Sequence, residues 1–378
     1  MLRACFILPS LLLLAVAMFC GSPAPAVASD ARTDGLGIQR EYLEDYILFR
    51  VFPTVAARYQ NLVTASLGTR SSGDRSVGVI GSGENTSYGT FAVYLNDLGN
   101  DAQQDAQIDV TWAKQFSGAA VGAAVNWTSS KVELNGTTTS PVFGIDANQL
   151  AFTGGLKLDM SDTGQLETAF EVASLTFQRA NGTTEDNGLS YRASARIMSE
   201  VSARTTLVPL AQYTHVDVTA EGSSDNTLDS FNLGVAAHHR VNGNDLLIMG
   251  IAVNHLKSDS PFLTSAGGTL LAGGEPGLEV ERWDLPALFA ALEFSVYDWL
   301  TARVGATKTV DVVNETRPTG PEIEKTESRF FFGLGLGIHF DHFDVDATVN
   351  PDAVFTGGYL FSGAVSQPLG RVTGTYYF

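Results

Sequence analysis

The chain has 378 residues, of which 41 are Asp or Glu and 23 are Lys or Arg, so its formal net charge is −18. This acidity argues against nucleic acid or an anionic surface as a partner. After residue 28, no segment approaches the roughly 18 consecutive apolar residues of a membrane-spanning helix, and glycine is abundant, at 38 residues. Two classes of protein remain: a soluble all-β protein and a transmembrane β-barrel.

The first 28 residues have the pattern of a secretory signal peptide. A positive charge near the start is followed by a long apolar run and by the small residues Ala26 and Ala28. We expect cleavage after Ala28, which leaves an exported chain. Both cysteines, Cys5 and Cys20, lie in this leader, so we expect neither disulfides nor thiol chemistry in the exported protein.

The segment after the leader contains one short apolar run, from Tyr46 to Pro53. Its eight residues are too few to span a membrane as a helix, and Arg50 lies in its middle. Pro53 would interrupt the hydrogen-bond ladder of a wall strand. We therefore expect residues 29–59 to fold as a plug inside a wall made by the rest of the chain. The residues expected to hold or gate this plug are Arg40, Glu44, Asp45, Arg50, Pro53 and Arg58.

From residue 60 onward, apolar residues recur with a period of two, which is typical of β-strands. In the run 326–341, the even positions from 330 to 340 are Phe, Leu or Ile, whereas Gly333, Gly335 and Gly337 lie on the other face. A barrel wall explains both faces, because one meets lipid and small residues on the other leave room in the lumen.

Similar runs of alternating residues recur along the chain and are predicted to be strands. They cover residues 60–68, 75–82, 88–96, 106–116, 118–127, 150–160, 165–178, 187–198, 200–216, 227–241, 244–257, 281–297, 299–312, 326–341, 342–350 and 369–378. The first two are short and could belong to the plug or the rim. The prediction is therefore an all-β fold, a transmembrane antiparallel β-barrel of about 14 strands (12–16) over residues 60–378.

The connections between these runs alternate in length. Short turns are predicted at 161–164, 241–244, 297–298 and 341–342, and longer loops at 128–149, 179–186, 217–226, 258–280, 313–325 and 351–368. Short periplasmic turns opposite longer external loops are typical of bacterial outer-membrane barrels.

The last strand ends on an aromatic residue, Phe378. Such an ending resembles the signal that the barrel assembly machinery reads, which makes that machinery an expected partner. Tyr297 and Trp299 flank a predicted turn and are expected to join the same aromatic girdle at the membrane interface.

Charged residues are predicted on the lumen face of neighbouring strands. The expected charge ladder comprises Lys157, Glu167, Glu171, Arg192, Arg196 and Arg204. Glu293 and Arg303 form a second expected pair across a predicted turn. Such a ladder either stiffens the wall through cross-strand pairs or forms an ion-selective constriction.

Catalytic and metal-binding patterns are weak. The sequence contains no serine nucleophile elbow and no phosphate-binding loop. His339, Asp341, His342 and Asp344 surround one turn and could hold a cation, but an interfacial polar turn explains them far better. We expect no enzymatic activity, no cofactor and no metal.

Two stretches resemble the long-chain fatty-acid transporter (FadL-type) superfamily and the related PorV-like barrels. Residues 33–57 resemble the family's N-terminal segment, through Gly35, Gly37, Tyr42, Asp45, Pro53 and Ala56, and residues 344–363 resemble a late strand that runs into an Asn-Pro turn. Where the family has Asn-Pro-Ala-Gly, this chain has Phe52–Pro53–Thr54–Val55. The resemblance implies a barrel of about fourteen strands, an N-terminal plug, and passage of hydrophobic small molecules.

The expected protein is thus a monomeric outer-membrane barrel of a Gram-negative-type bacterium, surrounded by outer-membrane lipid. Its expected function is uptake of a hydrophobic small molecule, and we expect no binding to nucleic acid. Two alternatives stay open: a PorV-like scaffold with a sealed lumen, and a general diffusion porin.

Overall fold

The computed structural model describes residues 29–59, 61–68, 75–82, 86–97, 106–131, 146–178, 185–219, 226–242, 245–259, 278–317, 320–350 and 369–378. The predicted signal peptide, the Asn-Pro turn near residue 350 and most of the predicted long loops lie outside these residues. No helix within the described ranges has the length and apolarity needed to cross a membrane.

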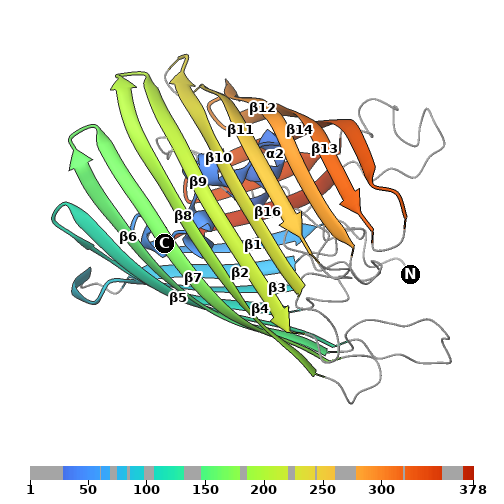
Figure 1. Cartoon of the computed structure of the whole chain (residues 1–378). Coiled ribbons are helices and arrows are strands. Elements are labelled where there is room, and N and C mark those ends of the chain that lie inside the picture. The colour runs from blue at the N-terminus through green and yellow to red at the C-terminus, as the bar shows by residue number, and fades with distance from the viewer. Residues whose placement is uncertain are drawn as a thin grey trace, which may run out of the picture.

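Residues 62–377 form a closed antiparallel barrel in which each strand pairs with its neighbours in the sequence (Figure 1). The strands are β1 (Leu62–Gly68), β2 (Arg75–Ser82), β3 (Thr90–Asp97), β4 (Ala106–Phe116), β5 (Ala119–Lys131), β6 (Asp146–Ser161), β7 (Gly164–Gln178), β8 (Glu185–Ser202), β9 (Thr205–Thr219), β10 (Asn226–Arg240), β11 (Leu246–Ser258), β12 (Glu279–Tyr297), β13 (Leu300–Thr316), β14 (Ile323–Phe340), β15 (Phe343–Val349) and β16 (Leu369–Tyr377).

The described residues form a barrel of sixteen strands, so the prediction of about fourteen is wrong, and the observed number lies at the upper limit of the predicted range of 12–16. The difference comes from β1 and β2, which the sequence could not assign to the plug, the rim or the wall. β1 pairs with β2 on one side and with β16 on the other, and thereby closes the barrel. These strands have only seven and eight residues, which is too short for their alternation to identify them as wall strands.

Alternation along each strand separates an outer from an inner face. On β3, Phe91 and Val93 are 53% and 42% exposed, whereas Ala92 and Tyr94 are at most 1% exposed. Tyr94 donates a hydrogen bond of 2.6 Å to Asp30, which lies inside the barrel. We call the face that carries residues such as Tyr94 the inner wall.

The connections sort by length, as predicted. Tight turns join β6 to β7, β8 to β9, β12 to β13 and β14 to β15. In an antiparallel barrel of this order, these turns lie at the same end as the C-terminus, because β16 ends there. Gly118, in the turn between β4 and β5, has a φ of 76°, which a residue without a Cβ adopts without strain.

Residues 29–59 lie inside the barrel, between the front and back walls (Figure 1). They form α2 (Asp30–Leu36) and three short 3₁₀ helices, η1 (Arg40–Tyr42), η2 (Tyr46–Arg50) and η3 (Pro53–Ala57); a fourth, η4 (Thr86–Tyr88), connects β2 to β3. We call residues 29–59 the N-terminal segment. The hydrophobic core of the molecule forms where this segment meets the inner wall.

Candidate functional site: the N-terminal segment and the inner wall

Helix α2 begins and ends with well-formed caps. The Ser29 hydroxyl accepts a hydrogen bond of 3.1 Å from the backbone N–H of Arg32, which is the usual N-cap arrangement. Gly37 has a φ of 60° and ends the helix. These caps fix the direction in which Arg32 leaves the helix.

Glycines on β13 and β14 form the seat of α2. A Cβ added at Gly333 would lie 2.8 Å from the carbonyl oxygen of Gly35, and one at Gly305 would overlap the carbonyl oxygen of Leu36. A Cβ added at Gly35 would lie 2.9 Å from the Cα of Gly335. The glycine face predicted from the sequence therefore does more than leave room: it lets the backbone of α2 touch the backbone of the wall.

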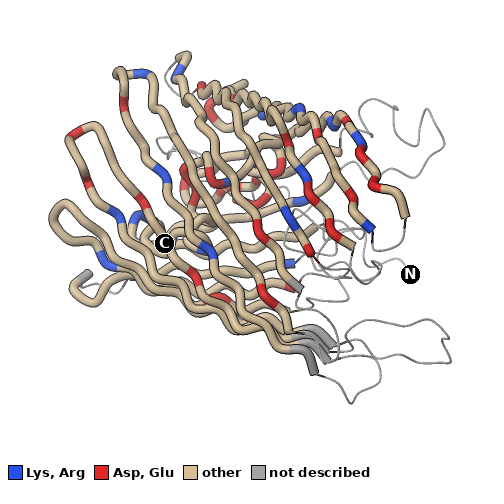
Figure 2. The backbone as a smooth tube through the Cα atoms, viewed as in Figure 1, with Lys and Arg blue, Asp and Glu red and all other residues tan. Residues whose placement is uncertain are grey.

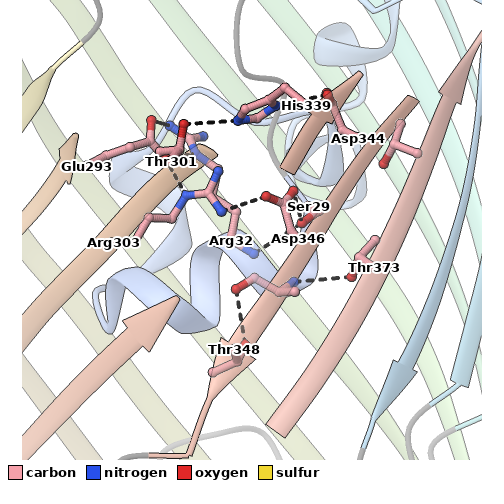
Figure 3. Close-up of polar contacts among 12 residues, drawn as sticks. Ser29, Arg32, Glu293, Thr301, Arg303, His339, Asp344, Asp346, Thr348 and Thr373 are labelled. Atoms are coloured by element: carbon pink, nitrogen blue, oxygen red, sulfur yellow. Dashed lines mark hydrogen bonds and ion pairs between the residues drawn. The ribbon is translucent and has the colours of Figure 1, made fainter. Parts of the chain in front are cut away.

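A buried network of charges surrounds the seat (Figure 3). Arg32 reaches Glu293 with two donors, at 2.7 and 3.0 Å. Arg303 donates to Glu293 at 2.6 Å and to Asp346 at 2.6 Å. Ser29 donates to the second oxygen of Asp346 at 2.7 Å. The Glu293–Arg303 pair predicted from the sequence is confirmed, and the N-terminal segment completes it.

Polar groups next to this network also make hydrogen bonds. His339 lies 2.9 Å from Asp344 and 3.0 Å from Thr301, and Tyr377 donates to Asp344 at 3.0 Å. His339 and Asp344 belong to the turn that the sequence offers as a candidate cation site. Among the residues that the structure describes, no group of three or more His, Cys, Asp or Glu side chains could hold a metal ion.

A second cluster holds the other end of the segment. Arg196 of β8 pairs with Glu167 of β7 at 2.6 Å, and Arg58 pairs with the same carboxylate. Arg196 also donates to two carbonyl oxygens of the segment, those of Glu41 at 2.9 Å and Leu43 at 2.6 Å. Burial lowers the pKa of Arg58, and the nearby charge of Arg196 lowers it further.

Contacts of η2 and η3 involve β3, β4 and β5. Arg50 pairs with Asp109 at 3.1 Å and lies 5.2 Å above the ring of Tyr94. Pro53 packs where a Cβ on Gly122 would lie 2.7 Å from its carbonyl carbon. Two of the predicted plug residues, Arg50 and Pro53, therefore touch the inner wall directly.

Asp45 is a buried carboxylate, and only one of its two oxygens makes a hydrogen bond to a described residue. It is 1% exposed, and its Oδ1 accepts a hydrogen bond of 3.0 Å from the backbone N–H of Ile47. Its Oδ2 has no hydrogen-bond partner among the described residues. Burial raises the pKa of Asp45 to about 7; Arg32 lowers it, and Asp30 and Asp346 raise it.

The remaining predicted plug residues are on the surface of the segment. Arg40 and Glu44 are exposed. The exposed positions of these two charges contrast with the buried or half-buried positions of Asp45, Arg50, Pro53 and Arg58.

The predicted charge ladder is present in part. Glu167 and Arg196 pair as expected, and Glu171 and Arg192 pair loosely, at 3.7 Å. Lys157 lies opposite Glu167 in the strand register, and its Nζ lies 3.3 Å from Asp159.

The placement of Arg204 in this ladder is wrong. β8 extends to Ser202 and β9 begins at Thr205, so Arg204 lies in the tight turn between them. Its side chain is exposed there, and its backbone N–H donates to the Ser202 hydroxyl at 3.3 Å. The predicted strand 200–216 began too early, because the alternation continues through the turn.

The sequence did not predict that Arg32 anchors α2 on Glu293. Arg32 and Glu293 are 261 positions apart, and only closure of the barrel brings them together. Asp346 offered a signal, because the alternation of 343–349 places Asp344 and Asp346 on one face of their strand. Figure 2 shows charged residues both along the strands and in the enclosed segment.

Comparisons with known proteins give similarity of fold. No protein-family model and no curated protein matches the sequence. Among solved structures, the CymD monoaromatic hydrocarbon channel has 11% identity and a TM-score of 0.41, over 94% of this chain and 98% of that one. A mutant of the TodX monoaromatic hydrocarbon channel has 9% identity and a TM-score of 0.39, over 88% and 94%.

Iron-siderophore receptors match as well. BauA, the ferric preacinetobactin receptor of Acinetobacter baumannii, has 13% identity and a TM-score of 0.46, over 76% of this chain and 53% of that one. The chain spans about half the length of three of these receptors, 42%, 53% and 49%. Because all these TM-scores are below 0.5, the function has to come from the chain's own residues and contacts.

Proposed function

We propose that the protein is a plugged channel of a Gram-negative-type outer membrane, with the N-terminal segment as its plug. The observation that carries this proposal is the attachment of the segment to the inner wall of a closed barrel at separate places. Buried ion pairs fix α2 on β12 to β15, and partly buried ones fix η2 and η3 on β4 and β7.

The outer face supports the membrane location. Large apolar side chains are exposed along the strands, for example Phe152 at 57%, Leu288 at 47% and Phe330 at 65%. Strands β6 to β14 have 13 to 19 residues, which exceeds the roughly 9–11 residues that cross a bilayer at a tilt. Tyr297 and Trp299 stack with ring centroids 5.8 Å apart beside their turn, as an interfacial girdle would place them.

The resemblance to FadL-type transporters makes hydrophobic small molecules the first substrate class to test. Passage requires part of the plug to move, because the core of the molecule lies between plug and wall. A sealed, PorV-like scaffold is the second candidate, and it is favoured by the full burial of Arg303 and Arg196 at the two attachments.

Reconstitution of the full chain in planar bilayers and liposomes tests the proposal. We expect a small conductance that rises several-fold in Arg196→Met, because this variant removes the donors to the carbonyl oxygens of Glu41 and Leu43. Lys114→Met, on the outer face of β4, is the control. Uptake of a fluorescent long-chain fatty acid into the same liposomes tests the substrate class.

If neither the original chain nor Arg196→Met conducts or admits any probe, the channel proposal fails and the scaffold is favoured.

A further inference from the structure

A row of polar side chains crosses the inner wall next to the plug. The row comprises Ser194, Gln212, Asn232, Asn254, Asp284 and Asp311, one from each strand from β8 to β13. Each residue is the register partner of the next, and these strands lie side by side in the barrel (Figure 1). With neighbouring strands about 4.8 Å apart, the row is about 24 Å long. We call it the polar row.

Hydrogen bonds link members of the row to one another. Gln212 donates to Ser194 at 3.3 Å, and Asn254 donates to Asp284 at 3.4 Å. Arg282 lies 2.8 Å from Asp284 and 3.5 Å from Asp311, so the two carboxylates share a cation. The centre of the row therefore offers neutral amides. At the other end of the row, Arg282 partly balances the negative charge of the two carboxylates.

The plug itself makes hydrogen bonds to the centre of the row. Asn232 donates to the side-chain oxygen of Gln39 at 2.7 Å, and the Gln39 amide donates to Gln212 at 3.4 Å. Gln39 is the N-cap residue of η1 and lies between α2 and η1. The Oδ1 atom of Asn232 is buried and has no hydrogen-bond partner among the described residues, so the row has unused capacity at the place where the plug meets it.

We propose that the polar row binds a neutral solute rich in hydroxyl groups, such as a short oligosaccharide, and that this solute displaces Gln39. A hydroxyl both donates and accepts, as the amides of Gln212 and Asn232 do, so it satisfies them without adding charge. A hydrocarbon in the same place would strip water from these amides and replace none of its hydrogen bonds.

This inference rests on the proposed function, because it needs the same plugged lumen, and it assigns to that lumen a polar substrate class in place of hydrophobic small molecules. Solute and plug compete for the same two amides. Binding therefore weakens the attachment of the plug between α2 and η1, which couples arrival of the solute to release.

Calorimetric titration of the full chain in detergent with maltotriose tests the proposal. We expect saturable binding that weakens about tenfold in Gln212→Leu and in Asn232→Leu, since each leaves a ligand hydroxyl unpaired. Gln39→Leu should instead tighten binding, about threefold, because it removes the competitor. Gln149→Leu, the same change on the inner face of β6 and outside the row, should leave binding unchanged.

The opposite effects of Gln212→Leu and Gln39→Leu on maltotriose affinity distinguish recognition of the solute from a merely structural role. Absence of saturable maltotriose binding would overturn the proposal, and so would a weakening in Gln39→Leu equal to that in Gln212→Leu. A channel whose conductance rises in Arg196→Met but which does not bind maltotriose keeps the proposed function and loses this substrate class. Maltotriose binding without any conductance keeps the site and removes the channel.

Discussion

The two ends of the N-terminal segment are attached to the barrel in different ways. At α2, backbone lies on backbone across the glycine seat, and the side chains of Arg32 and Glu293 are only 6% and 7% exposed. At η2 and η3 the contacts are made by longer side chains, and those of Arg50 and Arg58 are 19% and 22% exposed.

This difference concerns the outer ion pairs of the segment. Breaking a fully buried pair leaves an uncompensated charge and costs several kcal/mol, whereas an exposed pair is worth about 1 kcal/mol or less. We infer that the partly exposed side chains of Arg50 and Arg58 give way more readily than Arg32 does. Arg196, which is 0% exposed, still holds the carbonyl oxygens of Glu41 and Leu43 at the same end.

Glu293→Gln should have the largest effect. It removes the shared carboxylate of Arg32 and Arg303 and should lower the free energy of unfolding by about 3–5 kcal/mol. The matched control is Glu315→Gln, whose carboxylate pairs with Lys325 at 2.8 Å and is 18% exposed; it should cost less than about 1 kcal/mol. Chemical denaturation in detergent measures both. Equal losses of unfolding free energy in the two variants would contradict the special role of the buried network.

Gly305→Ala should have the next largest effect. The added Cβ overlaps the carbonyl oxygen of Leu36, so α2 has to shift, at a cost of about 1–3 kcal/mol. Gly154→Ala is the matched control, because nothing lies within 4 Å of its Cβ position. Protease access to the backbone near Arg32 should rise in the first variant and stay unchanged in the second. A neutral Gly305→Ala would show that α2 is not seated there.

Asp45 should make attachment of η2 depend on pH. Its folded pKa, about 7, lies above the ordinary value of 3.8, so the folded state holds the proton more tightly. This contribution is fully present below pH 4 and is lost as the pH rises through 7. Asp45→Asn should remove the dependence and keep the hydrogen bond from Ile47. Hydrogen exchange of residues 45–59 between pH 5 and pH 8 is the measurement, and an unchanged pH profile in the variant would refute it.

Arg192→Gln should have the smallest effect on stability. Arg192 lies 3.7 Å from Glu171 with its side chain 41% exposed, and an exposed pair of this kind contributes less than about 1 kcal/mol. The denaturation midpoint should therefore hardly move, in contrast to Glu293→Gln. A large loss would place Arg192 with the buried attachments.

Local patterns made the wall predictable. Alternation alone located the strands and assigned Gly333 and Gly335 to the inner face. It also placed Glu167 and Arg196 on the inner face of adjacent strands, where the register of the structure sets them opposite each other. The count failed at β1 and β2, because seven or eight residues are too few to distinguish a wall strand from a rim.

The contacts of the N-terminal segment were less predictable, because they join residues that are distant in the sequence. Nothing near Arg32 points to Glu293, and nothing near Gln39 points to Asn232; only the closed cylinder brings them together. The prediction for Arg204 was wrong for a local reason, because a tight turn can continue the alternation of the strands on both sides.

The position of the glycine seat has a consequence for the order of biosynthesis. Helix α2, near the start of the chain, rests on β13 and β14, and its network extends to β15. These strands are translated almost last, so the helix emerges from the ribosome long before its partners exist. The seam between β1 and β16 joins Asn61 to the final residue, Phe378, through a backbone hydrogen bond of 2.9 Å. The seat and the network of α2 are therefore complete only once the last strands of the barrel are in place.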